Sequence, residues 1–136
     1  MQLQTYLFFD GCCEAAIEFY RKTVGAQLEM LLRYKESPAP PPPGMNPGYS
    51  EKVMHSSFRI GDTTVLASDD CMGHPVAQGF SLVITVDTPA QAEQQFAALA
   101  QGGTVAMPLT KTFWSPSYGM LVDRFGVHWM VMARGT

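Results

Sequence analysis

Residues 81–102, SLVITVDTPAQAEQQFAALAQG, are the stretch of sequence that decides the fold. Side chains along 81–86 alternate between an apolar set and a more polar set, which predicts a strand with two different faces. Thr88 is suited to cap the N-terminus of a helix, and Pro89 to occupy its first position. The sequence therefore predicts a strand followed by a helix over 89–101, ended by the Gly-Gly pair that follows.

The same pattern stands 77 positions earlier, in residues 4–25, QTYLFFDGCCEAAIEFYRKTVG. Four identical pairs coincide at this shift: Asp10 with Asp87, Ala15 with Ala92, Phe19 with Phe96, and Gly25 with Gly102. A repeat of this kind indicates a chain built from two copies of one module. A cavity between the copies would be the natural place for a site.

Each copy is expected to contain a strand, a helix and three further strands. In the first copy we expect a helix over 12–24 and strands over 3–9, 27–35, 52–60 and 63–68. In the second we expect further strands over 104–107, 112–123 with a break at Pro116, and 127–133. The fold class is therefore α+β, with two β-α-β-β-β modules. We expect a single domain, with module one at about 1–70, a linker at about 71–78 and module two at about 79–136.

Composition narrows the functional classes. The 136 residues are 46% hydrophobic and 15% charged, as expected for a compact protein rather than a disordered one. The formal net charge is -3 and the 9 basic residues are scattered, so we expect no binding to nucleic acid. The opening MQLQTYLFFDG has the features of neither a signal peptide nor a membrane span. Together with 3 cysteines that form no disulfide framework, this predicts a cytoplasmic protein without a membrane partner.

A proline-rich insertion, 36–50, occurs only in the first copy. Its six prolines and two glycines exclude helix and sheet, and 40–43 are expected to form a short polyproline II segment. We interpret the insertion as a stiff exposed loop, in preference to a ligand for a proline-recognition domain. A lid over the mouth of the cavity is a further interpretation.

Four segments carry a resemblance to a known family: YLFFDG before the first helix, AAIEFYRKTVGA along it, TVLASD on the fourth strand, and FWSPSYGMLVDRFGVHW near the C-terminus. With the paired modules, they resemble the PhnB-like branch of the vicinal oxygen chelate superfamily, which includes glyoxalase I, bleomycin-resistance proteins and extradiol dioxygenases. The similarity covers nearly the whole chain. It implies the glyoxalase/bleomycin resistance fold, in which the modules form a cup-shaped mixed sheet with the helices outside. The demethylubiquinone methyltransferase-like label of this branch finds no support in the sequence, which has no glycine-rich nucleotide loop after a strand.

The resemblance also implies four metal-ligand positions, usually His or Glu, on the first and last strands of each module. In this sequence they fall on Gln4 or Thr5, Ala67, Ser81 and Met130, and a shift of one residue gives Tyr6, Ser68, Leu82 and Trp129. None of these side chains is a carboxylate or an imidazole, which a divalent ion needs in place of its water. We therefore expect no metal at the family position and no cofactor.

Of the histidines, His55 is the best candidate for a chemical role. It shares a predicted strand face with Val53, Ser57 and Arg59, opposite a more apolar face. His55 then either faces the cavity as a hydrogen-bond donor or base, or is satisfied by a neighbouring strand. Both interpretations remain open.

Other groups favour structural roles. Cys71 and His74 have the spacing of half a zinc site, without a second pair. His128, between apolar neighbours in the last strand, is interpreted as exposed or at an edge. The pair 12–13 begins a helix, where the dipole favours a reactive thiolate, but Cys13 lies on the apolar stripe and is interpreted as a core residue.

Two acidic motifs are also interpreted as structural. Asp69 and Asp70 are adjacent, so their side chains diverge in an extended chain and are assigned to the linker. Residues 123–126, DRFG, are expected to form the turn of the last hairpin.

Aromatic side chains provide the best candidates for a binding site. Tyr6 and Phe8 share a face of the first strand, and the final hairpin gathers Phe113, Trp114, Tyr118 and Trp129. Trp129 and Phe113 are expected in the core. With a few polar groups, the others would form an apolar, partly aromatic wall, as in most small-molecule pockets. The predicted ligand-binding residues are Tyr6, His55, Arg59, Ser81, Trp114 and Tyr118.

Two functions remain open, and no catalytic residue is assigned. The first is metal-free binding of a small molecule by a homodimer whose partner completes each cup, as the resemblance to resistance proteins implies. The second is a lyase or dioxygenase with a divalent ion at a displaced site, built from His55 and a Glu or Asp. A weaker third is phosphonate metabolism, attached to this branch by name, which would need a cation such as Arg33, Arg59 or Lys111 in the cup.

Overall fold

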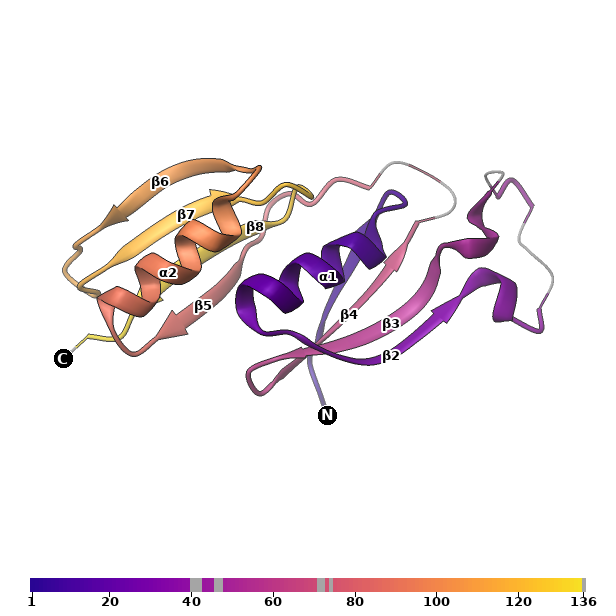
Figure 1. Ribbon diagram of the computed structural model, residues 1–136, viewed down its shortest axis with the longest axis horizontal. Helices are drawn as coiled ribbons and strands as arrows, with labels where there is room; N and C mark the ends of the chain where they lie inside the picture. Colours follow the sequence, from indigo (N-terminus) through magenta and orange to yellow (C-terminus); the bar gives the residue numbers. More distant parts are fainter. Residues whose placement is uncertain (40–42, 46–47, 71–72, 74, 136) are drawn as a thin grey trace. The chain divides into compact units, whose positions relative to one another are not determined.

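The structure, a computed structural model, describes residues 1–39, 43–45, 48–70, 73 and 75–135. The chain divides into two compact units, Met1–Val76 (unit 1) and Ala77–Thr136 (unit 2). Among the described residues, each unit holds one α-helix and one four-stranded mixed sheet (Figure 1). The α+β class with two β-α-β-β-β modules is confirmed. A cup shared by the two modules, within a single domain, stays a prediction.

Unit 1 comprises β1 (Thr5–Phe9), α1 (Cys13–Val24), β2 (Gln27–Arg33), β3 (Val53–Ile60) and β4 (Thr63–Asp69), in the sheet order β1-β4-β3-β2. β1 runs parallel to β4, and the other neighbouring strands are antiparallel. The Tyr20 ring of α1 lies 6.1 Å from the Phe58 ring of β3, and both side chains are fully buried. On β1, Leu7 is buried while Phe8 is 57% exposed. The helix therefore covers one face of the sheet, and Phe8 lies on the other.

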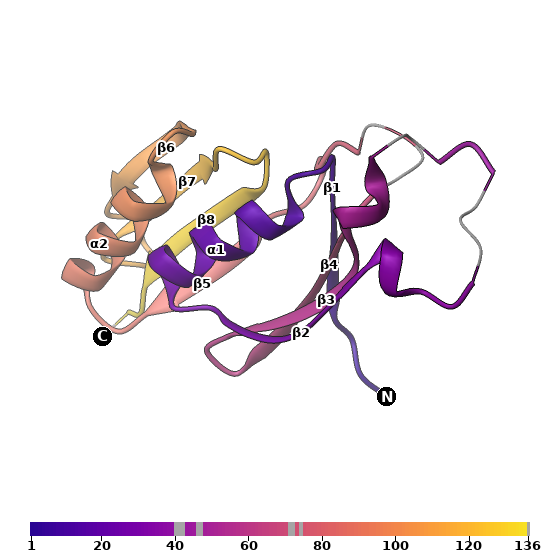
Figure 2. The same ribbon diagram turned by 45° about the vertical axis from the view of Figure 1, so that its right-hand side comes forward.

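Unit 2 repeats the arrangement with β5 (Leu82–Val86), α2 (Pro89–Ala100), β6 (Thr104–Thr110), β7 (Tyr118–Val122) and β8 (His128–Ala133), in the sheet order β5-β8-β7-β6. β5 runs parallel to β8. Figure 2 shows α2 lying across one face of this sheet. The predicted cap is confirmed: the Gln91 N–H donates to Thr88 Oγ1 at 3.2 Å, and the Thr88 N–H donates to Gln91 Oε1 at 3.1 Å.

The insertion of unit 1 begins and ends in short helical turns. β2 stops at Arg33, earlier than expected, because Tyr34–Glu36 form a 3-10 helix, and Tyr49–Glu51 form another just before β3. The expectation that 36–50 exclude helix is therefore wrong at both ends of the segment. Residues 40–42 and 46–47 lie outside the described residues, so the polyproline II segment and the lid stay predictions.

Two strand boundaries of unit 2 also differ from expectation. β6 continues beyond 107 to Thr110, and its register with β7 is irregular around Pro108, which an edge strand tolerates. β7 begins only at Tyr118, because the residues before it form a turn held by Ser115. The Thr112 N–H donates to the Ser115 carbonyl at 2.9 Å, and the Ser115 hydroxyl donates to the Ala133 carbonyl at 2.6 Å. Neither described helix has the length and apolar character that a membrane span requires.

Candidate ligand-binding site

The helix-free face of the unit 2 sheet, defined as the face that α2 does not cover, carries the candidate site. Along β8 every second residue is buried, beginning with Trp129. The residues between them, His128, Met130 and Met132, therefore lie on the helix-free face. On β5, Val83 pairs with Met130 and is 51% exposed.

A hollow of about 440 Å³ opens on this face, within unit 2. It is lined by Gly79, Phe80, Ser81, Val83, His128 and Met130. Its walls are mainly apolar, with the Ser81 hydroxyl and the His128 imidazole as polar groups. This composition is typical of a small-molecule pocket. The hollow contains Ser81, one of the predicted ligand-binding residues.

His128 has a different environment from the one expected. β8 lies between β5 and β7, and the His128 side chain is partly buried. The interpretation of His128 as exposed or at an edge is therefore wrong. Sequence reasoning missed it because the neighbours along the strand lie on the opposite face and say nothing about the hollow.

Tyr118 contacts Met130, and Trp114 packs against Tyr118. The Tyr118 hydroxyl donates to Met130 Sδ at 3.2 Å, and the Trp114 ring stands edge-on to the Tyr118 ring at 5.3 Å. Trp114 is 48% exposed, so much of its surface is free of packed neighbours. The structure thus brings Tyr118 next to a residue of the hollow and Trp114 next to Tyr118. Their role in binding stays a prediction.

The other two aromatic residues of the final hairpin have opposite environments. Trp129 is 2% exposed, and its Nε1 donates to Asp123 Oδ2 at 2.8 Å, so its expected place in the core is confirmed. Phe113 is 98% exposed, and its core assignment is wrong. The reason is that 112–117 form a turn instead of the expected strand, so no sheet face carries Phe113 towards α2.

In unit 1, Tyr6 and His55 form a pair on the helix-free face of the sheet. The Tyr6 hydroxyl lies 3.1 Å from His55 Nδ1, and the rings are stacked at 5.7 Å. β4 separates the strands that carry them, so Tyr6 reaches across one strand. The interpretation that another strand satisfies His55 is therefore supported, and its facing a cavity as a donor or base stays a prediction.

The residues expected to share the face of His55 do not all do so. Arg59 is exposed, and its guanidinium donates to the Gln27 side chain at 2.5 Å. Val53 is fully buried, because the register between β2 and β3 shifts between Val53 and His55, and such a bulge turns a side chain to the other face. The expectation that Val53 lies beside His55 is wrong.

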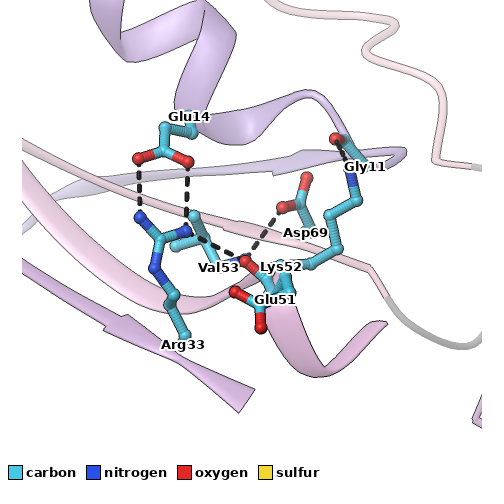
Figure 3. A pocket seen from close by; sticks show the side chains of 7 residues that line it. All are labelled: Gly11, Glu14, Arg33, Glu51, Lys52, Val53 and Asp69. Atoms are coloured by element: carbon cyan, nitrogen blue, oxygen red, sulfur yellow. Dashed lines mark hydrogen bonds and ion pairs between the residues drawn. The ribbon is translucent and has the colours of Figure 1, made fainter. Parts of the chain in front are cut away.

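A second hollow, of about 340 Å³, lies in unit 1 and has charged walls (Figure 3). It is lined by Gly11, Glu14, Arg33, Glu51, Lys52, Val53 and Asp69. Figure 3 shows the Arg33 guanidinium facing both carboxylate oxygens of Glu14, at 2.7 and 3.0 Å. This hydrogen bonding holds the pKa of Glu14 below its usual value. Arg33 is thus engaged with a carboxylate, and Lys52 donates to the Gly11 carbonyl at 2.9 Å. We interpret this hollow as a structural ion-pair network.

One buried aspartate in each unit has a structural role. Asp69 is the last residue of β4 and is 1% exposed, so its assignment to a linker is wrong. Its carboxylate accepts hydrogen bonds from two backbone N–H groups, those of Cys13 and Val53. In unit 2, Asp123 begins the predicted turn of the last hairpin, which is confirmed by a 3.0 Å bond from the Gly126 N–H to the Asp123 carbonyl.

The metal positions implied by the resemblance do not fit a divalent ion. Ala67 is fully buried and paired with Leu7, so its side chain points into the core. In unit 1, the alternative positions shifted by one residue, which include Tyr6, are therefore the ones on the helix-free face. Met130 offers a thioether, which does not replace the water of a hard ion. In the described part of the chain, no three His, Cys, Asp or Glu side chains are placed to hold a metal ion. The absence of a cofactor stays a prediction.

The thiols at the start of α1 are not activated. Cys13 is fully buried, and burial raises the pKa of its thiol to about 12. Burial also raises the pKa of Cys12. The core interpretation of Cys13 is confirmed, and the interpretation as a reactive thiolate is not supported. Cys71 and His74 lie outside the described residues.

Comparison with known proteins places the chain in a family. A family model described as 3-demethylubiquinone-9 3-methyltransferase matches residues 1–132. Protein YjdN of Escherichia coli (strain K12) is 32% identical over 139 residues, which cover 96% of this chain and 94% of YjdN.

Solved structures agree with this placement. Protein PA1353 from Pseudomonas aeruginosa has a TM-score of 0.87 at 39% identity, with 98% of each chain covered. The PhnB protein from Bacillus cereus, named a putative 3-demethylubiquinone-9 3-methyltransferase, has a TM-score of 0.82 at 27% identity and covers 98% of this chain and 99% of its own. A glyoxylase/bleomycin resistance protein/dioxygenase domain from Frankia sp. EAN1pec has a TM-score of 0.69 at 9% identity, with 99% and 92% covered, and shows the likeness of fold alone. The resemblance found in the sequence is thereby confirmed: the chain belongs to the PhnB-like 3-demethylubiquinone-9 3-methyltransferase family, and it shares the fold of a glyoxylase/bleomycin resistance protein/dioxygenase domain.

Proposed function

We propose that this protein binds an apolar or aromatic small molecule in the hollow on the helix-free face of unit 2, and that binding needs no divalent metal ion. The hollow itself is the observation that carries the proposal. Its volume of about 440 Å³ lies within the range of about 300–1,000 Å³ that ligand pockets occupy. Val83 and Phe80 remain about half exposed in it, at 51% and 45%, so a ligand would remove apolar surface from water.

The groups around the hollow support an oriented ligand. Ser81 and His128 offer hydrogen bonds at an otherwise apolar wall, which would fix the orientation of a polar substituent. Tyr118, which contacts Met130, and Trp114, which packs against Tyr118, would extend the wall with aromatic surface. Tyr6, His55 and Arg59, the remaining predicted ligand-binding residues, belong to unit 1.

The alternatives have less support. A displaced metal site for a lyase or dioxygenase needs acidic or imidazole partners for His55, but its Nδ1 faces the Tyr6 hydroxyl, and no suitable cluster exists among the residues described. For phosphonate binding, Arg33 and Arg59 already contact Glu14 and Gln27. The family description contains the word methyltransferase, but the proposed function includes no methyl transfer.

The proposed location and assembly follow the same lines. We place the protein in the cytoplasm, where the free thiols of Cys12 and Cys13 would stay reduced. We also propose a homodimer, for which the exposed apolar residues of β1 and β2 are the support.

Binding of 8-anilinonaphthalene-1-sulfonate, a fluorescent apolar aromatic anion, tests the site. Val83→Arg would place a long charged side chain in the hollow and should weaken binding of this probe severalfold. Val105→Arg is the matched control, because Val105 is a similarly exposed valine, at 46%, on the other edge strand of the same sheet and does not line the hollow. Equal binding by the two variants, or no binding by the wild type, would overturn the proposal.

A further inference from the structure

Three methionines form a cluster on the helix-free face of unit 2. Met120 on β7 is paired directly with Met130 on β8, and Met132 follows on the same face of β8. All three are partly exposed, whereas the residues that alternate with them, such as Leu121 and Trp129, are buried under α2. The cluster is therefore accessible and does not belong to the core of the unit.

The spacing of the cluster allows the three sulfur atoms to meet. Directly opposed residues of antiparallel strands have Cβ atoms about 5 Å apart, and residues two apart on one strand face are separated by about 7 Å. Two sulfur atoms bound to one metal ion at about 2.3 Å lie about 4 Å apart. The methionine side chain has three rotatable bonds, so Met120, Met130 and Met132 can bridge these separations without a change of the backbone.

One sulfur atom is already held on the required side. The Tyr118 hydroxyl donates to Met130 Sδ at 3.2 Å, although Tyr118 is paired with Met132 and not with Met130. The hydrogen bond therefore crosses the strand pair diagonally and holds the Met130 sulfur on the helix-free face.

We infer that Met120, Met130 and Met132 form a binding site for a soft monovalent metal ion, Cu(I). Thioether sulfur is a soft, neutral ligand that favours Cu(I). Hard divalent ions need anionic or imidazole donors, which three thioethers do not provide. The site thus differs in ligand chemistry from the one that the superfamily resemblance implies, and it involves no redox step.

Silver provides a redox-inert probe of the site. Protein labelled with 13C at the methionine methyl groups, with its accessible thiols first alkylated by iodoacetamide, is titrated with Ag(I) and followed by NMR. We expect the methyl signals of Met120, Met130 and Met132 to shift and to saturate near one equivalent. Met30 and Met54, which lie on strands of unit 1, are internal controls and should not shift. Uniform shifts of all methionines would show adventitious binding and overturn the inference.

Substitution separates this site from the proposed binding of organic ligands. Met120→Leu with Met132→Leu preserves volume and apolar character, and neither residue lines the hollow, so the fold and the binding of 8-anilinonaphthalene-1-sulfonate should persist. Affinity for Cu(I), measured anaerobically against bicinchoninate, should fall by at least about tenfold, since a lost ligand costs no less than a lost outer-shell partner. Unchanged Cu(I) affinity would refute the metal site while leaving ligand binding intact. If the wild type did not bind the dye, that result would instead contradict the proposed function alone.

Discussion

The carboxylate of Asp69, at the end of β4, accepts a hydrogen bond from the backbone N–H of Cys13, the first residue of α1, at 2.9 Å. Its second oxygen accepts from the backbone N–H of Val53 at 3.0 Å. The N-cap residue Cys12 provides no side-chain cap, so Asp69 satisfies an N–H of the first helical turn from another strand. One buried carboxylate thus joins β4, β3 and α1.

Asp69→Ala should destabilise unit 1 by about 2–4 kcal/mol, because two buried N–H groups lose their acceptors. Urea denaturation followed by circular dichroism measures the loss. Glu93→Ala, which removes an exposed carboxylate from α2, is the control and should change stability little. Similar midpoints for the two variants would show that the bonds of Asp69 contribute nothing to the folded state.

The two tryptophans allow a direct test of core against surface. Trp129→Ala should cost about 3–5 kcal/mol, because it removes a 2% exposed side chain and leaves Asp123 without its indole partner. Trp114→Ala should leave a near-native denaturant melt and weaken the binding of an apolar probe, since Trp114 is 48% exposed. A large loss of stability in Trp114→Ala would assign this residue to packing and remove it from the proposed wall.

The Glu14–Arg33 pair predicts a weak dependence of stability on pH. Hydrogen bonding to Arg33 lowers the pKa of Glu14 in the folded state. The ionised pair therefore stabilises the fold above the usual glutamate pKa of about 4.3, and this contribution is lost as the pH falls through the lower folded value. The effect should be small and reduced by salt, because the Glu14 side chain is 60% exposed.

Glu14→Gln should accordingly be less stable than the wild type at pH 7 and approach it at pH 3. Glu18→Gln, which removes the exposed 2.8 Å pair with Arg21 within α1, is the matched control for loss of a surface carboxylate. The same stability difference at both pH values would contradict a contribution from the ionised Glu14 carboxylate.

Nickel and zinc should not raise the melting temperature of the protein. Ala67 and Met130 stand where the family resemblance implies metal ligands, and a tight site would stabilise by several kcal/mol at saturating ion. Differential scanning fluorimetry with and without each ion measures the shift. An increase of many degrees that His55→Ala abolishes would instead support a displaced metal site.

A homodimer is expected in solution. β1 carries apolar residues on both faces: Leu7 and Phe9 are buried, while Phe8 is still 57% exposed, and on β2 Leu28 is 46% exposed. A second copy would remove such apolar surface from water. Light scattering at micromolar concentration should give twice the monomer mass. A monomer mass across a concentration series would rule the dimer out.

Local patterns determined the order of the elements. The strand, the cap and α2 could be predicted from sequence, because Thr88, Pro89 and the alternation of 81–86 act within a few residues of one another. The repeat then predicted the same elements, β1 and α1, in the first copy. Segments with weaker local signals were placed less well. The turn before β7 depends on the contact of Ser115 with Ala133, which no window around residue 115 contains.

In the candidate site, too, some features could be predicted from the sequence and others could not. Alternation along β1 correctly separated Tyr6 and Phe8 from the core, and Ser81, which directly precedes β5, was selected from the alternation of 81–86. The partners of these residues were decided by tertiary structure, because they lie on other strands. The bond between Tyr6 and His55 crosses β4, and the hollow of His128 and Ser81 joins residues that are far apart in the chain. Asp69 is the clearest case. The sequence by itself determined that a carboxylate follows an apolar strand. Only the packing of α1 and β3 around it made that carboxylate a buried acceptor, because backbone N–H groups find their partners by position in space.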